Sequence, residues 1–225
     1  RSKKINTGWK KEDGTWLKNK NNEVIKNEIF IHLLLQNLTQ FFNRGEHGNI
    51  RLEDADWNDG LDMAHGKGES VPFSAAFAAN LATLAKYCTL LAEKGTHTLS
   101  IPSEMHSLIK PGLPVALLND PQKLQAVLQD YFIKVEEGKI SGEYIAVNLN
   151  ELSEILHTYS EALKKQIRNN EFISTGTHEY FNGYYNNDGI RLEGMINAHE
   201  QMTLTGQVFP IMSGVATEAQ CKKSF

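Results

Sequence analysis

SAAFAANLATLAKYCTLLAEK, residues 74–94, is rich in alanine and leucine and predicts a long helix. Ser74 is the expected N-cap, because a serine hydroxyl accepts a hydrogen bond from a free N–H of the first turn. Gly95 is the expected stop. The small side chains of this segment favour close packing against another helix. The fold should therefore be built around helices.

Apolar spacing and proline positions predict four further helices. In residues 23–42, apolar side chains cover most of the circumference, so this helix should be nearly fully buried. The others are expected at residues 121–137, 150–168 and 203–219, the first of them starting at Pro121 after Asp120. Strand signals are short, at residues 99–101 and 144–147. Long helices joined by long loops indicate antiparallel helix pairs with function in the loops at one end.

Composition excludes several classes of protein. The chain has 225 residues, 40% of them hydrophobic, and a net charge of −4. This mild negative charge gives no footprint for nucleic acid or for an anionic membrane surface. No uninterrupted apolar run approaches the ~20 residues of a membrane span, and two cysteines cannot form a disulfide framework. We therefore expect one domain over residues 1–225, without an internal boundary, in the cytoplasm.

The loop between the first two predicted helices is strongly acidic. Residues 44–71 read RGEHGNIRLEDADWNDGLDMAHGKGESV, with seven carboxylates around the single Trp57. Mutual repulsion in such a cluster raises some carboxyl pKa values, which suits a proton donor near neutral pH. The indole of Trp57 offers a flat face for a sugar ring. Gly66 and Gly68 would let the backbone pass close to a ligand or move as a lid.

Three other interpretations of this loop compete. Most acidic runs are simply solvated, and Trp57 could be a core residue; both interpretations stay open. A calcium loop is the third, because Asp54, Asp56 and Asn58 have the spacing of an EF-hand. That interpretation fails, since the sixth position is Asp59 where glycine is needed and the twelfth is His65 where glutamate is needed.

A second loop region is rich in aromatic and amide side chains. Residues 175–194 read TGTHEYFNGYYNNDGIRLEG. Such a segment could line a saccharide cleft. For the run Asn186-Asn187-Asp188-Gly189, however, an ordinary tight turn is the favoured interpretation.

These motifs carry a family resemblance. DADWNDGLD and GKGES, within residues 54–70, resemble the glycoside phosphorylases of glycoside hydrolase family 94. FNGYYNNDGIRLEG at residues 181–194 and MTLTGQVFPIMSGVATEAQ at residues 202–220 look like the next landmarks in the same order. The sequences of these motifs are most similar to those of 1,2-β-oligoglucan phosphorylases. The related domain of cyclic β-1,2-glucan synthases is the second most similar. The resemblance is scattered over residues 8–220.

The resemblance implies an (α/α)6 toroid, in which paired helices ring a central site. Five helices are predicted here, fewer than a toroid needs, so we expect residues 1–225 to be part of that catalytic domain. The family's sugar-holding arginine and aspartate upstream of DWNDG have no match in this chain. Its phosphate-binding histidine and threonine–glycine pair, which follow the helix containing Gln207, have none either. Further segments of the same enzyme are thus expected partners.

The resemblance also implies the chemistry. Asp59 is the expected general acid of an inverting phosphorylase, which cleaves β-1,2-gluco-oligosaccharides with inorganic phosphate and releases α-glucose 1-phosphate. Trp57 would contact the sugar at the cleaved bond, Asp54 would face the acceptor sugar, and Asp56 would support them. Glu69 and Gln207 are expected in the same substrate-binding cleft.

Phosphate is the expected co-substrate, and no metal or other cofactor is expected. A homodimer is left open, and partners of nucleic acid or membrane are not expected. The alternatives are a truncated or non-catalytic glycan-binding relative, a cellobiose phosphorylase, and a domain of the cyclic β-1,2-glucan synthase type.

Overall fold

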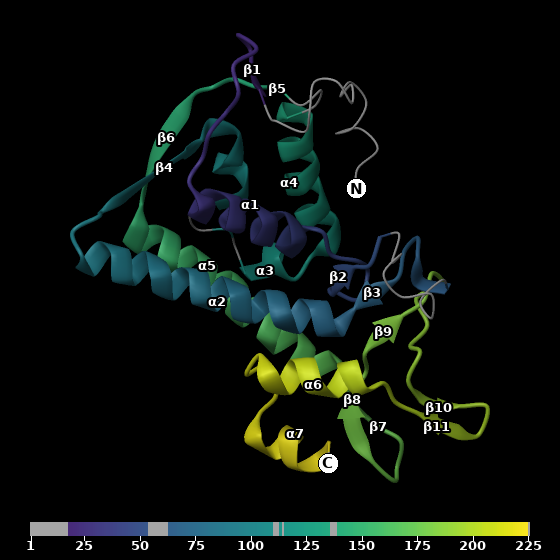
Figure 1. The fold of residues 1–225 in the computed structure, drawn as a ribbon. Coiled ribbons are helices and arrows are strands. Elements are labelled where there is room, and N and C mark those ends of the chain that lie inside the picture. The colour runs from purple at the N-terminus through teal and green to yellow at the C-terminus, as the bar shows by residue number, and fades with distance from the viewer. Residues whose placement is uncertain (1–17, 54–62, 110–112, 114, 136–138, 225) are drawn as a thin grey trace.

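The computed structural model describes residues 18–53, 63–109, 113, 115–135 and 139–224. The fold is mainly α, as the sequence predicts, with about 53% of the described residues in helices. Short two- and three-stranded sheets connect the helices (Figure 1). The (α/α)6 toroid implied by the family resemblance stays a prediction.

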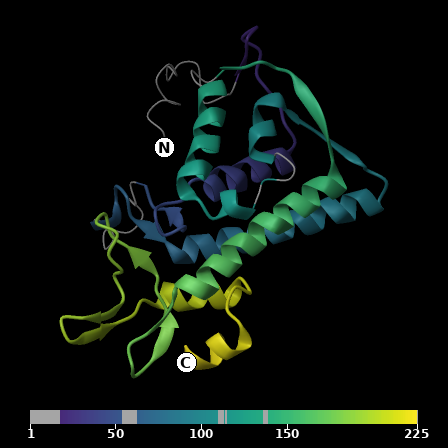
Figure 2. The same ribbon diagram turned by 180° about the vertical axis from the view of Figure 1, so that it is seen from behind.

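Two long antiparallel helices form the centre of the fold, α2 (Val71–Glu93) and α5 (Leu149–Asn170). Figures 1 and 2 show them side by side along most of their length. The Ser160 hydroxyl donates to the carbonyl of Ala78 at 2.7 Å, and both residues are fully buried. The Ser153 hydroxyl donates to the carbonyl of Ala85 at 2.9 Å, closer to the C-terminus of α2 and to the N-terminus of α5. The small side chains of α2 allow this close approach, as predicted.

The start of α2 lies before the predicted one. Ser70, not Ser74, is the N-cap, and its hydroxyl accepts from the N–H of Phe73 at 3.1 Å. Ser74 lies inside the first turn, donates to the Ser70 carbonyl at 2.7 Å and accepts from the N–H of Ile50 at 2.8 Å. The prediction was wrong because the apolar pattern hides a helix start at the end of a strand. The predicted stop is confirmed, since Gly95 has φ +92°.

The remaining helices lie on two sides of this pair (Figure 1). On one side lie α1 (Ile29–Phe42), the 3-10 helix η3 (Ser103–Ile109), α3 (Val115–Leu118) and α4 (Pro121–Lys134). On the other side lie α6 (Leu204–Met212) and α7 (Glu218–Lys223). The nearly full burial expected for α1 was wrong, because Ile29 is 79% exposed. The single helix expected at residues 203–219 is interrupted at Gly214, which has φ +67°.

Both predicted strands exist, and they pair with each other. β4 (Thr98–Pro102) follows α2, β6 (Tyr144–Asn148) precedes α5, and the two are antiparallel. They connect to the helix pair at the end formed by the C-terminus of α2 and the N-terminus of α5 (Figure 1). Strands of two or three residues form further pairs. β1 (Lys18–Asn19) pairs with β5 (Lys139–Ile140), and β7 (Phe172–Ser174) pairs with β8 (Glu179–Phe181). β10 (Gly194–Ile196) pairs with β11 (His199–Gln201).

Among the described residues, α2 is the one helix long and apolar enough to cross a membrane by length and composition. Single polar residues divide this segment, so it contains no long uninterrupted apolar run. About 33% of its most apolar window is buried. Its buried face, from Val71 to Cys88, packs in the main core with α5, as the core helix of a helical domain does.

Candidate functional site

A three-stranded sheet joins the acidic region and the aromatic region of the sequence. Its order is β2 (Ile50–Arg51), β3 (Glu69–Ser70) and β9 (Tyr184–Tyr185), all antiparallel. Glu69 lies opposite Tyr185 and Ser70 opposite Tyr184, and the N–H of Val71 donates to the carbonyl of Gly183 at 2.9 Å. The predicted site residues Asp54, Asp56, Trp57 and Asp59 lie outside the described residues. The chain on either side of them, at Leu52 and Ala64, packs against Tyr184.

Asn187 connects the aromatic region to the acidic region by hydrogen bonds next to this sheet. Its side-chain oxygen accepts from the N–H of Gly66 at 2.8 Å and from the N–H of Lys67 at 2.7 Å. Its own N–H donates to the carbonyl of Met63 at 2.8 Å. The preceding Asn186 closes a tight turn, because its side chain accepts from the N–H groups of Asp188 and Ile190. The predicted turn is therefore confirmed, and it also carries a contact to the GKGES motif.

The two glycines of the GKGES motif differ in their surroundings. A Cβ on Gly68 would lie 2.3 Å from the carbonyl oxygen of Ala64, so this glycine is required by the chain's own backbone. A Cβ on Gly66 would come no closer than 3.4 Å, to the side chain of Asn187. Gly68, one of the two glycines expected to approach a ligand or to move as a lid, thus lies against the backbone of Ala64 in the same loop.

Glu69 is buried and fully engaged by the turn at residues 45–49. Its Oε1 accepts from the N–H of His47 at 3.0 Å and lies 2.9 Å from Nδ1 of the same residue. Its Oε2 accepts from the N–H of Asn49 at 2.9 Å. A Cβ on Gly45 would lie 2.4 Å from the Glu69 carboxyl carbon, which leaves room for glycine only. The described contacts of Glu69 therefore shape this turn, and its contact with substrate stays a prediction.

A buried network continues from His47 to Glu171. The His47 ring stacks on Tyr185, with ring centroids 3.8 Å apart. The Tyr185 hydroxyl donates to Glu171 at 2.9 Å, and burial together with this carboxylate raises the pKa of the phenol. Glu171 is fully buried and also accepts from the amides of Asn49 and Asn182. No local pattern in the sequence marks Glu171, because its donors come from distant segments.

Glu193 is a second buried carboxyl group that sequence patterns do not reveal. It is 3% exposed and accepts hydrogen bonds from the N–H of Gly183 and the hydroxyl of Thr203. Burial raises the pKa of Glu193 to about 7, although these hydrogen bonds oppose the shift. A Cβ on Gly183 would lie 2.5 Å from its carboxylate oxygen. Glu193 can therefore gain or lose a proton near neutral pH at the edge of β9.

Gln207 lies on α6 and holds that helix to β8. Its Oε1 accepts from the N–H of Phe181 at 2.9 Å, and its Nε2 donates to the carbonyl of Phe181 at 2.7 Å. The residue is 6% exposed. Its described role is to position the aromatic segment, and its expected contact with substrate stays a prediction.

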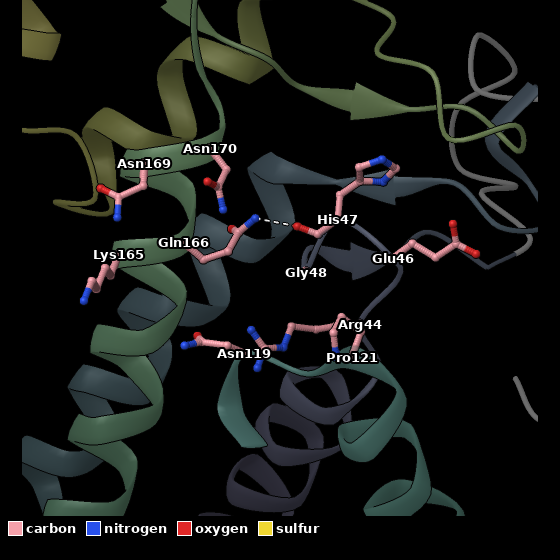
Figure 3. A pocket seen from close by; sticks show the side chains of 10 residues that line it. All are labelled: Arg44, Glu46, His47, Gly48, Asn119, Pro121, Lys165, Gln166, Asn169 and Asn170. Atoms are coloured by element: carbon pink, nitrogen blue, oxygen red, sulfur yellow. Dashed lines mark hydrogen bonds between the residues drawn. The ribbon is translucent and has the colours of Figure 1, made fainter. Parts of the chain in front are cut away.

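A polar cavity of about 330 Å³ opens beside the turn at residues 45–49 (Figure 3). Its lining comes from this turn, from the start of α4 and from the last turns of α5. Gln166 of α5 crosses it and donates to the carbonyl of His47 at 2.6 Å. Arg44 forms part of its wall. The sequence had marked Arg44 only as the start of the acidic region.

In the part of the chain that the structure describes, no three histidine, cysteine, aspartate or glutamate side chains gather to hold a metal ion. Comparison with known proteins adds no relative: no protein-family model matches this chain, and no curated protein matches it.

Proposed function

We propose that this chain is part of an inverting glycoside phosphorylase that cleaves β-1,2-linked gluco-oligosaccharides with inorganic phosphate. The observation that carries the proposal is the three-stranded sheet β2–β3–β9. It brings the GKGES motif beside the aromatic segment, two landmarks that are more than a hundred residues apart in the sequence. Both are landmarks of the same family resemblance, and the aromatic segment could line a saccharide cleft, so their contact supports a shared site.

The proposed reaction needs one acid from the protein. Asp59 donates its proton to the glycosidic oxygen of the leaving sugar. A phosphate oxygen attacks the anomeric carbon from the opposite face of the ring, and the carbon–oxygen bond to the leaving sugar breaks. The product is α-glucose 1-phosphate, because the configuration is inverted. Phosphate is already an anionic nucleophile, so the carboxylate base of an inverting hydrolase is not needed.

The same proposal places the chain in an (α/α)6 toroid of the cytoplasm. The antiparallel pair of α2 and α5 supports this, because helices paired in this way are the repeating unit of such a toroid. Loops at the end of the pair that bears β3 and β9 would then face the central site, together with further segments of the same enzyme. A reaction that retains the phosphate ester is of use inside the cell.

The decisive experiment measures glucose 1-phosphate release. Purified protein is incubated with β-1,2-gluco-oligosaccharide and phosphate, and Asp59→Asn is compared with Asp130→Asn. Asp130 is an exposed acid on α4 that pairs with Lys134, so its variant controls for the loss of one carboxylate. We expect Asp59→Asn to lose about 10²-fold or more of the activity, in the range of an essential acid, and Asp130→Asn to keep it.

Other outcomes separate the alternatives. Oligosaccharide binding without glucose 1-phosphate identifies a non-catalytic or truncated relative. Release of free glucose without phosphate consumption identifies a hydrolase. Full activity of Asp59→Asn removes Asp59 as the acid.

A further inference from the structure

The polar cavity is lined by a buried cation, Arg44, that forms no ion pair among the described residues. Arg44 is 2% exposed, and its guanidinium donates to the carbonyl of Leu118 and lies 4.8 Å from the ring centroid of Phe41. Its Nε–H is buried and has no hydrogen-bond partner among the described residues. Buried charges in proteins are normally paired and fully hydrogen-bonded. The described residues therefore satisfy the hydrogen-bonding capacity of this guanidinium only in part.

The neighbouring acids are occupied by other donors or directed elsewhere. The two oxygens of Glu69 accept from His47 and Asn49, as described above. Burial lowers the pKa of Arg44 to about 10, and Glu69 opposes that shift, so the guanidinium remains charged at neutral pH. In Figure 3, the carboxylate of Glu46 extends away from the Arg44 guanidinium. An anion in the cavity would therefore meet Arg44 without displacing a carboxylate.

Further donors belong to the lining of the cavity on other elements. Lys165, Asn169 and Asn170 lie on the last turns of α5, and Asn119 lies just before α4 (Figure 3). Arg44 and Lys165 supply positive charge, and the amides can bond hydroxyl groups as well as oxyanions. Donors that approach from three separate segments suit a tetrahedral anion better than a planar carboxylate. The volume of about 330 Å³ is that of a small-molecule pocket.

We propose that this cavity binds a phosphate group, free or carried by a small hydroxylated ester such as a sugar phosphate. Arg44 is the main contact, since its guanidinium matches phosphate oxygens with strong, directional hydrogen bonds. Lys165 adds charge at the mouth, and the asparagine side chains take the remaining oxygens or the hydroxyl groups of an ester. The inference does not require the phosphorylase reaction.

Calorimetric titration of the whole chain tests this site, with inorganic phosphate, glucose 1-phosphate, acetate and glucose as separate probes. We expect both phosphates to bind, and acetate and glucose to bind at least about tenfold more weakly, as loss of a charge-assisted contact predicts. Glucose 1-phosphate binding more tightly than phosphate identifies an ester as the ligand, and equal binding identifies free phosphate. Either result supports the site.

Variants locate the binding. Lys165→Met should weaken phosphate binding about threefold, the range of an exposed ion pair, while Lys86→Met, an exposed lysine of α2, should not change it. Arg44→Lys keeps the charge but loses the guanidinium geometry, and should weaken binding about tenfold. Circular dichroism shows whether that buried variant folds; Lys165→Met remains decisive if it does not. Equal dissociation constants for Lys165→Met, Lys86→Met and wild type overturn the proposal, as does acetate binding as tight as phosphate.

Discussion

The Oε1 atom of Glu69 lies 2.9 Å from Nδ1 of His47. This pair joins the end of the GKGES motif to the turn at residues 45–49, and the His47 ring in turn stacks on Tyr185 of the aromatic segment. The two loop regions that the sequence marks as candidates for a saccharide site, residues 44–71 and 175–194, are thus connected through the contacts of Glu69 and His47.

Glu69→Ala should destabilise the fold. It leaves the N–H groups of His47 and Asn49 without their acceptor, and each buried unsatisfied group costs about 1–3 kcal/mol. Urea unfolding should show a loss of roughly 3 kcal/mol in the free energy of unfolding. Glu46→Ala, at an exposed acid of the same turn, is the control and should change it by less than about 0.5 kcal/mol. Equal stability of the two variants would show that the Glu69 hydrogen bonds contribute little.

Under the proposed function, Asn187→Ala should reduce the release of glucose 1-phosphate more than it reduces the stability of the fold. The Asn187 side chain holds Gly66 and Lys67, which follow the segment containing Asp59. A displacement of about 1 Å in a catalytic group can cost about 10²-fold in rate, so we expect a decrease between about 10-fold and 100-fold. Steady-state assays of glucose 1-phosphate release measure it. The neighbouring Asp188→Ala, at an exposed turn position, should keep its rate; the same loss in both variants would refute a specific role for Asn187.

Gly68→Ala should destabilise the protein, and Gly66→Ala should not. The new Cβ at position 68 would lie 2.3 Å from the Ala64 carbonyl oxygen, whereas the one at position 66 has ordinary contacts. Overpacking of this kind costs about 1–3 kcal/mol. Thermal unfolding of the two variants measures the difference, and a Gly68→Ala variant as stable as Gly66→Ala would mean that residues 64–68 adapt.

Glu193 should make stability fall as the pH rises from weakly acidic to neutral. Its pKa is raised from 4.5 to about 7 in the folded chain, so the folded state binds the proton more tightly than the unfolded state. The stabilisation is complete below about pH 4.5, declines between about 4.5 and 7, and is lost above; it amounts to roughly 3 kcal/mol at most.

Glu193→Gln removes this titration and keeps an amide that can bond both Gly183 and Thr203. Urea unfolding at about pH 5 and about pH 8 should show a smaller stability difference for the variant than for the wild type. An identical difference in both proteins would mean that Glu193 does not titrate in this range.

Local patterns in the sequence were sufficient for most of the helices. α4 begins at Pro121 after the N-cap Asp120, and α5 buries Leu152, Leu156 and Leu163 on one face, as predicted. Both depend on capping and on 3.6-residue periodicity, which neighbouring residues determine. The sequence did not predict the true start of α2, because that helix begins directly after the paired strand β3. It did not predict the break at Gly214 either, because that break depends on the left-handed conformation of the glycine.

The candidate site divides in the same way. The sequence by itself determined the candidate acid Asp59, with Asp54, Asp56 and Trp57, because the DWNDG motif is continuous in the chain. Tertiary structure alone decided that Glu69 holds His47, that burial raises the pKa of Glu193, and that the cation of Arg44 lies in a polar cavity. The physical reason is that burial and hydrogen-bond partners come from segments far apart in the sequence, so no local pattern contains them.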